Sequence, residues 1–330
     1  MSQHGTHLSQ RHAGRRLAIL APVLVLALVT GVTGMFGGSA EVARQGPFPV
    51  HPGTPATLPD DRLGSEVAGG AQPATVSIPV GPNLVVPILY YHYIRTIAPT
   101  PQNLLSFELS IPPGLFARQM ALLHVEGAHT ITLATLMQAL RGRTRLPSHP
   151  VVLTFDDGYA DFATAAEPVL QKYGFVATAF VVSGFVNRPR YMTAAQVRQM
   201  DADGMVIGAH TVHHVDLASI PLAAARTEID NSLAALEALL GHPVLDFAYP
   251  YGGFNSAVEQ LVQQAGFRDA VTTVGGVVQS LTGCFAFHRT DIGGAPSLAD
   301  FAHDAGLPPP SAADQTRIAD MTQVSALHNV

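Results

Sequence analysis

Short apolar runs alternate with amphipathic stretches along most of this chain, and this alternation limits what the chain can fold into. The strand-like runs are 85–91, 151–155, 176–182, 205–209, 245–249, 270–273 and 285–287, and the helix-like stretches lie near 114–126, 133–141, 161–173, 193–202, 221–240 and 255–265. Strand–helix alternation of this kind predicts a parallel α/β fold, and a barrel is the natural closure for seven such units. In such a barrel, functional groups gather at the carboxyl ends of the strands.

Composition excludes several other classes of protein. Only 13% of the 330 residues are charged and 47% are hydrophobic, which is the opposite of a disordered chain. The 18 Lys and Arg residues are too sparse for the basic field of a nucleic-acid-binding protein. Charge this sparse also argues against a coiled coil. The single cysteine, Cys284, rules out an intrachain disulfide and a Cys-rich metal site.

The two ends of the chain differ from the α/β region. Arg11, Arg15 and Arg16 precede an uncharged, mostly apolar segment, so residues 1–40 are expected to be a signal peptide or membrane anchor. Either form predicts an exported protein at the cell surface or outside the cell, with 17–36 as the anchor if it is not cleaved. The expected domain organisation is a Pro-rich linker at 41–85, a folded domain at 86–306 and a C-terminal tail of coil at 307–330.

Residues with metal-binding or acid–base chemistry follow several of the predicted strands. The run 151–155 leads into Asp156 and Asp157, and the run 205–209 leads into His210 and His214. Asp-Gly is also a common turn pair, and a His-rich loop can be merely polar. Several such clusters at one edge of one sheet nevertheless indicate a functional site. Aromatic clusters end two further runs, as Tyr90-Tyr91-His92-Tyr93 and Tyr249-Pro250-Tyr251.

The sequences Thr-Phe-Asp-Asp-Gly-Tyr at 154–159 and His-Thr-Val-His-His at 210–214 resemble motifs of the polysaccharide deacetylases, carbohydrate esterase family 4. The resemblance to this NodB homology domain covers about residues 86–300. It implies a distorted (β/α)7-type barrel that holds one divalent metal. Carried over by position, Asp157, His210 and His214 are the metal ligands and Asp156 is the catalytic base. Zn²⁺ suits such a mixed N/O site, and Co²⁺, Ni²⁺ or Mn²⁺ are alternatives.

The resemblance also implies an activity, which is the hydrolysis of N-acetyl groups on an extracellular N-acetylglucosamine-containing polysaccharide. The metal would activate water and polarise the acetyl carbonyl, and Asp156 would take the proton. The backbone N–H of Tyr251 would stabilise the oxyanion, and Tyr249, Pro250 and Tyr159 would contact the substrate. The expected partners are the acetylated polysaccharide and, if the N-terminal segment is uncleaved, the membrane. No nucleic acid and no obligate protein partner are expected.

This chain departs from the family pattern in three places. Ala248 stands where the family has an Arg that orients the base, and Arg289 is the candidate replacement. The family's late Trp motif is absent because the chain has no Trp, and its late Leu-x-His motif has only His288 as a near match. His92 is therefore predicted as the general acid, as in the poly-β-1,6-N-acetylglucosamine deacetylase branch. His213 lies between motif positions and is expected to be a bystander.

Two other functions remain open from the sequence. The same fold could act as an O-acetyl esterase on a xylan-like glycan. An ester leaves more easily than an amide, so loss of His92 would harm an esterase less. The chain could also be a non-catalytic glycan-binding module, although the presence of both the base and the three ligands argues against this.

Overall fold

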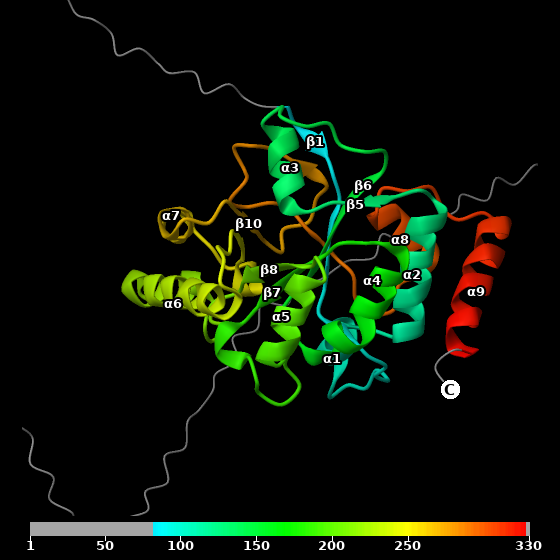
Figure 1. The fold of residues 1–330 in the computed structure, drawn as a ribbon, viewed down its shortest axis with the longest axis horizontal. Coiled ribbons are helices and arrows are strands. Elements are labelled where there is room, and N and C mark those ends of the chain that lie inside the picture. Colours follow the sequence, from blue (N-terminus) through cyan, green and yellow to red (C-terminus); the bar gives the residue numbers. More distant parts are fainter. Residues whose placement is uncertain (1–81, 328–330) are drawn as a thin grey trace, which may run out of the picture. The chain divides into compact units, whose positions relative to one another are not determined.

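Parallel strands form the centre of the structure, a computed structural model that describes residues 82–327 (Figure 1). The strands lie in the order β10-β9-β8-β7-β6-β2-β12, and β5 pairs with the start of β6. Every neighbouring pair along this path is parallel, which confirms the predicted α/β class. The bounds are β2 Ile88–Tyr91, β5 His129–Thr130, β6 Pro150–Phe155, β7 Thr178–Val181, β8 Val206–Ala209, β9 Asp246–Ala248, β10 Asp269–Val271 and β12 Thr290–Asp291.

The sheet curls until its two end strands meet. Val271 of β10 forms a parallel bridge with Phe287, three residues before β12, and the Thr272 N–H donates to the Phe287 carbonyl at 3.0 Å. The predicted strand at 285–287 is thus only a bridge, and the paired strand lies at 290–291. The curled sheet is joined here at one point rather than along a full strand pair, so the barrel is distorted.

Helices flank the sheet and follow the predicted positions closely. Thr193 caps α5 in a reciprocal capping box with Gln196, and the Asn255 side chain accepts from two N–H groups of α7, as expected of N-cap residues. The helices are α1 Leu104–Glu108, α2 Pro113–Val125, α3 Leu133–Leu140, α4 Glu167–Tyr173 after a π-helical turn Phe162–Ala166, α5 Ala194–Ala202, α6 Leu222–Leu240, α7 Ser256–Ala265, α8 Leu298–Asp304 and α9 Ala312–Leu327. Two small ladders join β1 Leu84–Val85 to β11 Val278–Gln279 and β3 Tyr93–Ile94 to β4 Ser110–Ile111.

Side chains along each strand alternate between two apolar clusters. In β6, Val151 and Leu153 belong to the larger cluster, which also contains residues of most of the helices, whereas Val152 belongs to a second cluster. The second cluster collects inward-facing side chains of β2, β6, β7, β9 and β10 together with buried side chains of α3. By this period of two, Asp156 and His92 continue the inward-facing rows of β6 and β2.

The two ends of the chain give different results. The predicted signal or anchor at 1–40 and nearly all of the linker at 41–85 lie outside the described residues. Within 82–327, the structure has no helix that is both long and apolar enough to cross a membrane.

The prediction of coil at 307–330 is wrong, because α9 occupies most of that segment. Ile318 is buried in the main core, and the Lys172 ammonium donates to the Met321 carbonyl at 2.8 Å. Helix α9 is therefore part of the folded unit, and it lies along α2 (Figure 1).

Candidate active site and metal centre

Asp156 follows β6 and is held by Arg289 from across the barrel. The Arg289 Nη1 and Nη2 groups donate to the two carboxylate oxygens of Asp156, each at 2.7 Å. Both side chains are buried, and the same guanidinium also donates to the Thr154 hydroxyl at 3.1 Å and the Thr272 carbonyl at 2.7 Å. Burial would raise the pKa of Asp156, but the charge and hydrogen bonds of Arg289 outweigh it and hold that pKa below its usual range. Asp156 is therefore a carboxylate at neutral pH.

This contact confirms the prediction that Arg289 replaces the family's arginine, whose position Ala248 occupies here. Arg289 comes from the segment just before β12, 133 residues from Asp156 in the chain. Its guanidinium lies 4.5 Å from the ring centroid of Tyr90, on the inward-facing row of β2. A bidentate pair of this kind fixes the plane of the carboxylate as well as its charge.

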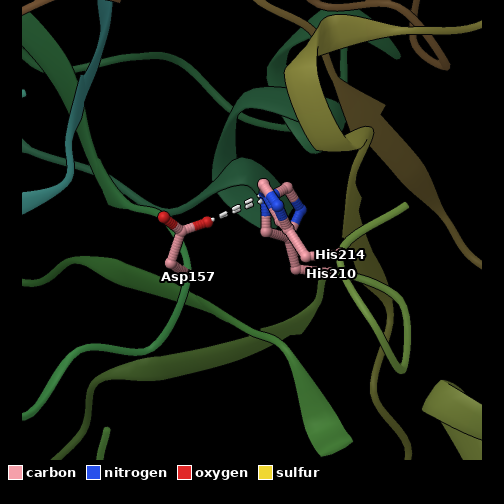
Figure 2. A group of neighbouring side chains, drawn as sticks. All are labelled: Asp157, His210 and His214. Atoms are coloured by element: carbon pink, nitrogen blue, oxygen red, sulfur yellow. Dashed lines mark ion pairs between the residues drawn. The ribbon is translucent and has the colours of Figure 1, made fainter. Parts of the chain in front are cut away.

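Asp157, His210 and His214 come together at the carboxyl ends of β6 and β8 (Figure 2). The Oδ1 atom of Asp157 lies 3.0 Å from His214 Nε2 and 3.5 Å from His210 Nε2. One ligand atom from each residue falls within 4.8 Å of the others. The backbone is bent to achieve this, since Asp157 has a φ of 73° and His214 a φ of 55°.

The donor atoms of this cluster suit a divalent cation. His210 Nδ1 must donate to the Ala248 carbonyl at 2.7 Å, because a carbonyl only accepts, and this leaves a lone pair on Nε2. His214 Nδ1 lies 3.1 Å from the Tyr251 hydroxyl, so its Nε2 also faces Asp157. The buried Asp157 Oδ1 has no hydrogen-bond partner among the described residues. Lone pairs that converge in this way, two from imidazole and one from carboxylate, fit a metal such as Zn²⁺.

His92 follows β2, next to β6, and lies on the same inward-facing row as Tyr90. Its ring lies 5.6 Å from that of Tyr90, centroid to centroid, and Tyr90 also contacts the Arg289 guanidinium that binds Asp156. His288 lies elsewhere. Thr290 pairs with Leu89, which places His288 at the amino end of β2, opposite the edge that carries the two aspartates. The alternative of His288 as general acid is therefore wrong.

Tyrosines surround the cluster. The Tyr159 ring stacks on Tyr93 at a centroid distance of 3.7 Å and on Tyr191 at 5.0 Å. Tyr251 is 68% exposed and has a φ of 59°. Burial raises the pKa of Tyr93, Tyr159 and Tyr251, and the charge of Asp157 raises the pKa of each further.

Three comparisons with known proteins bear on this site. Residues 143–270 match the family model described as polysaccharide deacetylase. A Bacillus subtilis protein named as a polysaccharide deacetylase, YxkH, is 28% identical over 220 residues, which cover 67% of this chain and 75% of that protein. The solved structure of the Streptococcus pyogenes deacetylase PplD in complex with acetate shares 28% identity and a TM-score of 0.62, and covers 68% of this chain and 99% of that chain.

The chain contains a polysaccharide deacetylase domain. As a polysaccharide deacetylase it is a hydrolase that acts on carbon–nitrogen bonds other than peptide bonds. A shorter match is to the poly-β-1,6-N-acetyl-D-glucosamine N-deacetylase of Escherichia coli K12, 36% identical over 81 residues. That match covers 24% of this chain and 12% of the E. coli protein, so it gives only weak support to the resemblance to the poly-β-1,6-N-acetylglucosamine deacetylase branch.

Two of the predicted substrate contacts of this deacetylase are wrong. Tyr249 is 0% exposed, and its hydroxyl donates to the Phe285 carbonyl at 3.0 Å. Its ring stacks on Phe254, on the helix side of the sheet. Pro250 is also buried. Alternation along β9 is the cause, because Ala248 faces inward and its neighbour Tyr249 must face outward.

Sequence reasoning missed two residues near the deacetylase site. Tyr191 continues the tyrosine stack from a loop in which no local pattern marks it. Glu228 of α6 binds the loop between the two histidines. A glutamate on an exposed-looking helix carries no signal of this role, because its target is set by how α6 packs rather than by sequence spacing.

Proposed function

We propose that this domain removes N-acetyl groups from an extracellular polysaccharide that contains N-acetylglucosamine, with a divalent metal, Zn²⁺ in the first instance, at Asp157, His210 and His214. The observation that carries the proposal is the convergence of three ligand atoms within 4.8 Å beside a carboxylate that Arg289 keeps charged. The named substrate of the E. coli relative and the tyrosines around the cluster support a sugar polymer.

Each residue of this chain has a defined part in the proposal. When bound, the metal lowers the pKa of water and polarises the acetyl carbonyl. Asp156 accepts a proton as water attacks, and its orientation is fixed because both of its oxygens bind Arg289. His92, on the inward-facing row of the neighbouring strand, protonates the departing amine, because an amide nitrogen leaves poorly as an anion. The backbone N–H of Tyr251 stabilises the oxyanion.

Tyr159 is the substrate-binding residue that we retain from the sequence. Its ring, stacked between Tyr93 and Tyr191, forms a wall beside the cluster, and its hydroxyl and ring edge are suited to an amphipathic sugar. Tyr251 lies on the other face of His214, at a centroid distance of 4.6 Å. We propose that the sugar chain lies between these tyrosines. Export to the cell surface belongs to the same proposal and rests on the sequence of residues 1–40 alone.

The test is acetate release by the purified, metal-loaded protein from acetylated polymers, among them β-1,6-linked N-acetylglucosamine, chitin oligomers and peptidoglycan. We expect release from at least one of them, and loss of release with a chelator and in Asp157→Asn. Asp156→Asn should lower the rate by about 10²–10⁴-fold, the usual contribution of a positioned base. Failure of the metal-loaded protein on every N-acetylated polymer would overturn the proposal.

His92→Ala distinguishes an amide substrate from an ester. We expect the variant to lose most of its rate on the N-acetylated polymer and to keep most of it on an activated acetyl ester, whose leaving group needs little protonation. Equal losses on the two substrates would remove His92 from the role of general acid. Release of acetate from acetylated xylan alone would instead identify an O-acetyl esterase.

A further inference from the structure

The loop that carries the two histidines is strained. Thr211 has a φ of 64° and His214 a φ of 55°, both in the left-handed region that residues other than Gly rarely adopt. Such a residue is strained and persists only where the surroundings fix it. Whatever fixes residues 211–214 therefore also fixes the direction in which the His210 and His214 rings point.

Glu228 of α6 makes several contacts with this loop. Its Oε2 atom accepts from the N–H groups of Val212 and His213, each at 2.9 Å. Its Oε1 atom lies 2.7 Å from Nδ1 of His213. The Glu228 side chain is only 14% exposed, so these are shielded hydrogen bonds to a charged group, which are stronger than neutral ones.

The opposite side of the loop is held by two backbone hydrogen bonds and by the Ser183 hydroxyl, which donates to the Thr211 carbonyl at 3.5 Å. The N–H groups of Ser183 and Gly184 donate to the carbonyls of Thr211 and Val212 at 3.1 and 3.0 Å. A Cβ atom at Gly184 would collide with the Val212 carbonyl, so the two segments lie as close as they can. The loop is thus fixed between the segment after β7 and the Glu228 carboxylate, which binds both N–H groups at its centre.

We propose that Glu228 is a positioning residue, which acts through the backbone of Val212 and His213 to hold the His210 and His214 rings at the metal. The inference rests on the proposed metal site but not on the substrate. The inference also gives a role to His213, which the sequence predicted to be a bystander. The His213 ring binds the Glu228 carboxylate and helps to orient that carboxylate. Outer partners of metal ligands typically contribute 10–100-fold to metal affinity.

Glu237 provides a matched control on the same helix. Its Oε1 atom accepts from the Val244 N–H at 3.2 Å, so it too ties α6 to a following loop, but that loop carries none of the three proposed ligands. Full-length Glu228→Ala, Glu228→Gln and Glu237→Ala would be compared with the parent protein. The measurements are Zn²⁺ affinity by chelator competition, the visible absorption spectrum with Co²⁺, and the thermal midpoint without metal.

We expect Glu228→Ala to bind Zn²⁺ about 10–100-fold more weakly and to change the Co²⁺ spectrum. Glu228→Gln should recover much of the affinity, because its amide oxygen can still accept from both backbone N–H groups. Glu237→Ala should keep its Zn²⁺ affinity within about threefold of that of the parent protein, even if its thermal midpoint falls as far as that of Glu228→Ala.

Unchanged Zn²⁺ affinity in Glu228→Ala would overturn the inference, and so would an equal loss in Glu237→Ala. If Glu228→Ala does not fold, Glu228→Asp, whose shorter side chain would not reach both backbone N–H groups, decides the matter by the same affinity measurement. Failure of the proposed function is separate, because a protein that releases no acetate from any polymer can still show the Glu228-dependent difference in metal binding.

Discussion

Asp156 stays charged in the interior because a single guanidinium binds both of its oxygens. In the family pattern the arginine lies close to the oxyanion motif, whereas here it comes from the other end of the domain. From the sequence, Arg289 is only a candidate for this replacement, since it lies just after the last strand-like run, 285–287. The Arg289 side chain reaches Asp156 because successive side chains along that segment point to opposite faces. Phe287 and Arg289 therefore lie inside the curl, and His288 is exposed.

Arg289→Ala should lower the free energy of unfolding by about 3–5 kcal/mol, because it leaves a buried carboxylate without its cation. Deacetylation should fall by at least about 100-fold, because the base loses its orientation. Arg289→Lys should recover only part of either quantity, since one ammonium cannot bind both oxygens in the same way. Urea unfolding and acetate release are the measurements.

The double variant Arg289→Ala, Asp156→Asn separates stability from catalysis. Removal of the buried charge should restore much of the stability that Arg289→Ala loses, and activity should stay lost. If the double variant were no more stable than Arg289→Ala, the uncompensated charge would not be the cause.

Asp269 is a second buried carboxylate, and its pKa is raised, whereas that of Asp156 is lowered. Asp269 and Asp246 lie together at the amino ends of β10 and β9, and Arg268 donates to both. Burial, followed by the charge of Asp246, raises the pKa of Asp269 well above its usual range, while burial also raises that of Asp246. The folded protein therefore keeps a proton that the unfolded chain loses near pH 4, and stability falls as pH rises toward the raised pKa.

The variant Asp269→Asn tests whether the proton on Asp269 makes stability fall as pH rises. The amide resembles the protonated acid, so the free energy of unfolding of the variant should depend less on pH above about pH 4 than that of the parent protein, and the variant should be the more stable protein at alkaline pH. Each unit of raised pKa corresponds to about 1.4 kcal/mol. Asp269→Ala is the control for lost contacts, and it should be less stable than Asp269→Asn at every pH. Urea titrations at several pH values would measure both, and parallel curves for the parent protein and Asp269→Asn would contradict the assignment.

At the scale of elements, the caps and the apolar periodicity predict most helices to within a residue or two. Short strands are predicted less well. The segment after β10 shows this, because of its apolar residues 285–287 only Phe287 forms a bridge, while its paired strand is 290–291. Helix α9 has no strong apolar stripe, and Ile318 is the one buried side chain among its residues 312–323, so its sequence resembles that of a polar tail. What makes it a helix in the fold is its packing on α2, which no local pattern encodes.

Ile318→Ala should destabilise the protein by about 2–5 kcal/mol, the usual result when a large buried aliphatic side chain is removed. Thr316→Ala on the exposed face of α9 is the control and should change stability by less than about 0.5 kcal/mol. The same logic predicts that a chain ending at residue 306 unfolds at a lower temperature than the full chain. Equal effects of the two substitutions in urea unfolding would mean that α9 is not part of the cooperative unit.

For the whole molecule, the three proposed ligands join the carboxyl ends of β6 and β8, so metal should stabilise the entire fold. At a free concentration of 100 times its dissociation constant, a ligand that binds only the folded state adds about 2.7 kcal/mol. We expect the thermal midpoint to rise with Zn²⁺ and to fall again with a chelator. Asp157→Asn should remove this response, whereas His213→Ala, which leaves the three ligands intact, should retain most of it. If Zn²⁺ did not change the thermal midpoint of the parent protein, the proposed metal site would be contradicted.

The contact between Arg289 and Asp156 also sets the order in which the site can be built. Asp156 is synthesised long before its partner, and 133 residues separate the two. Until the segment before β12 has been made and has closed the curl beside β10, the carboxylate has no cation to compensate its burial. A partly synthesised chain therefore cannot assemble the proposed centre, and Asp156, the proposed base, gains its cation only after Arg289 has been made.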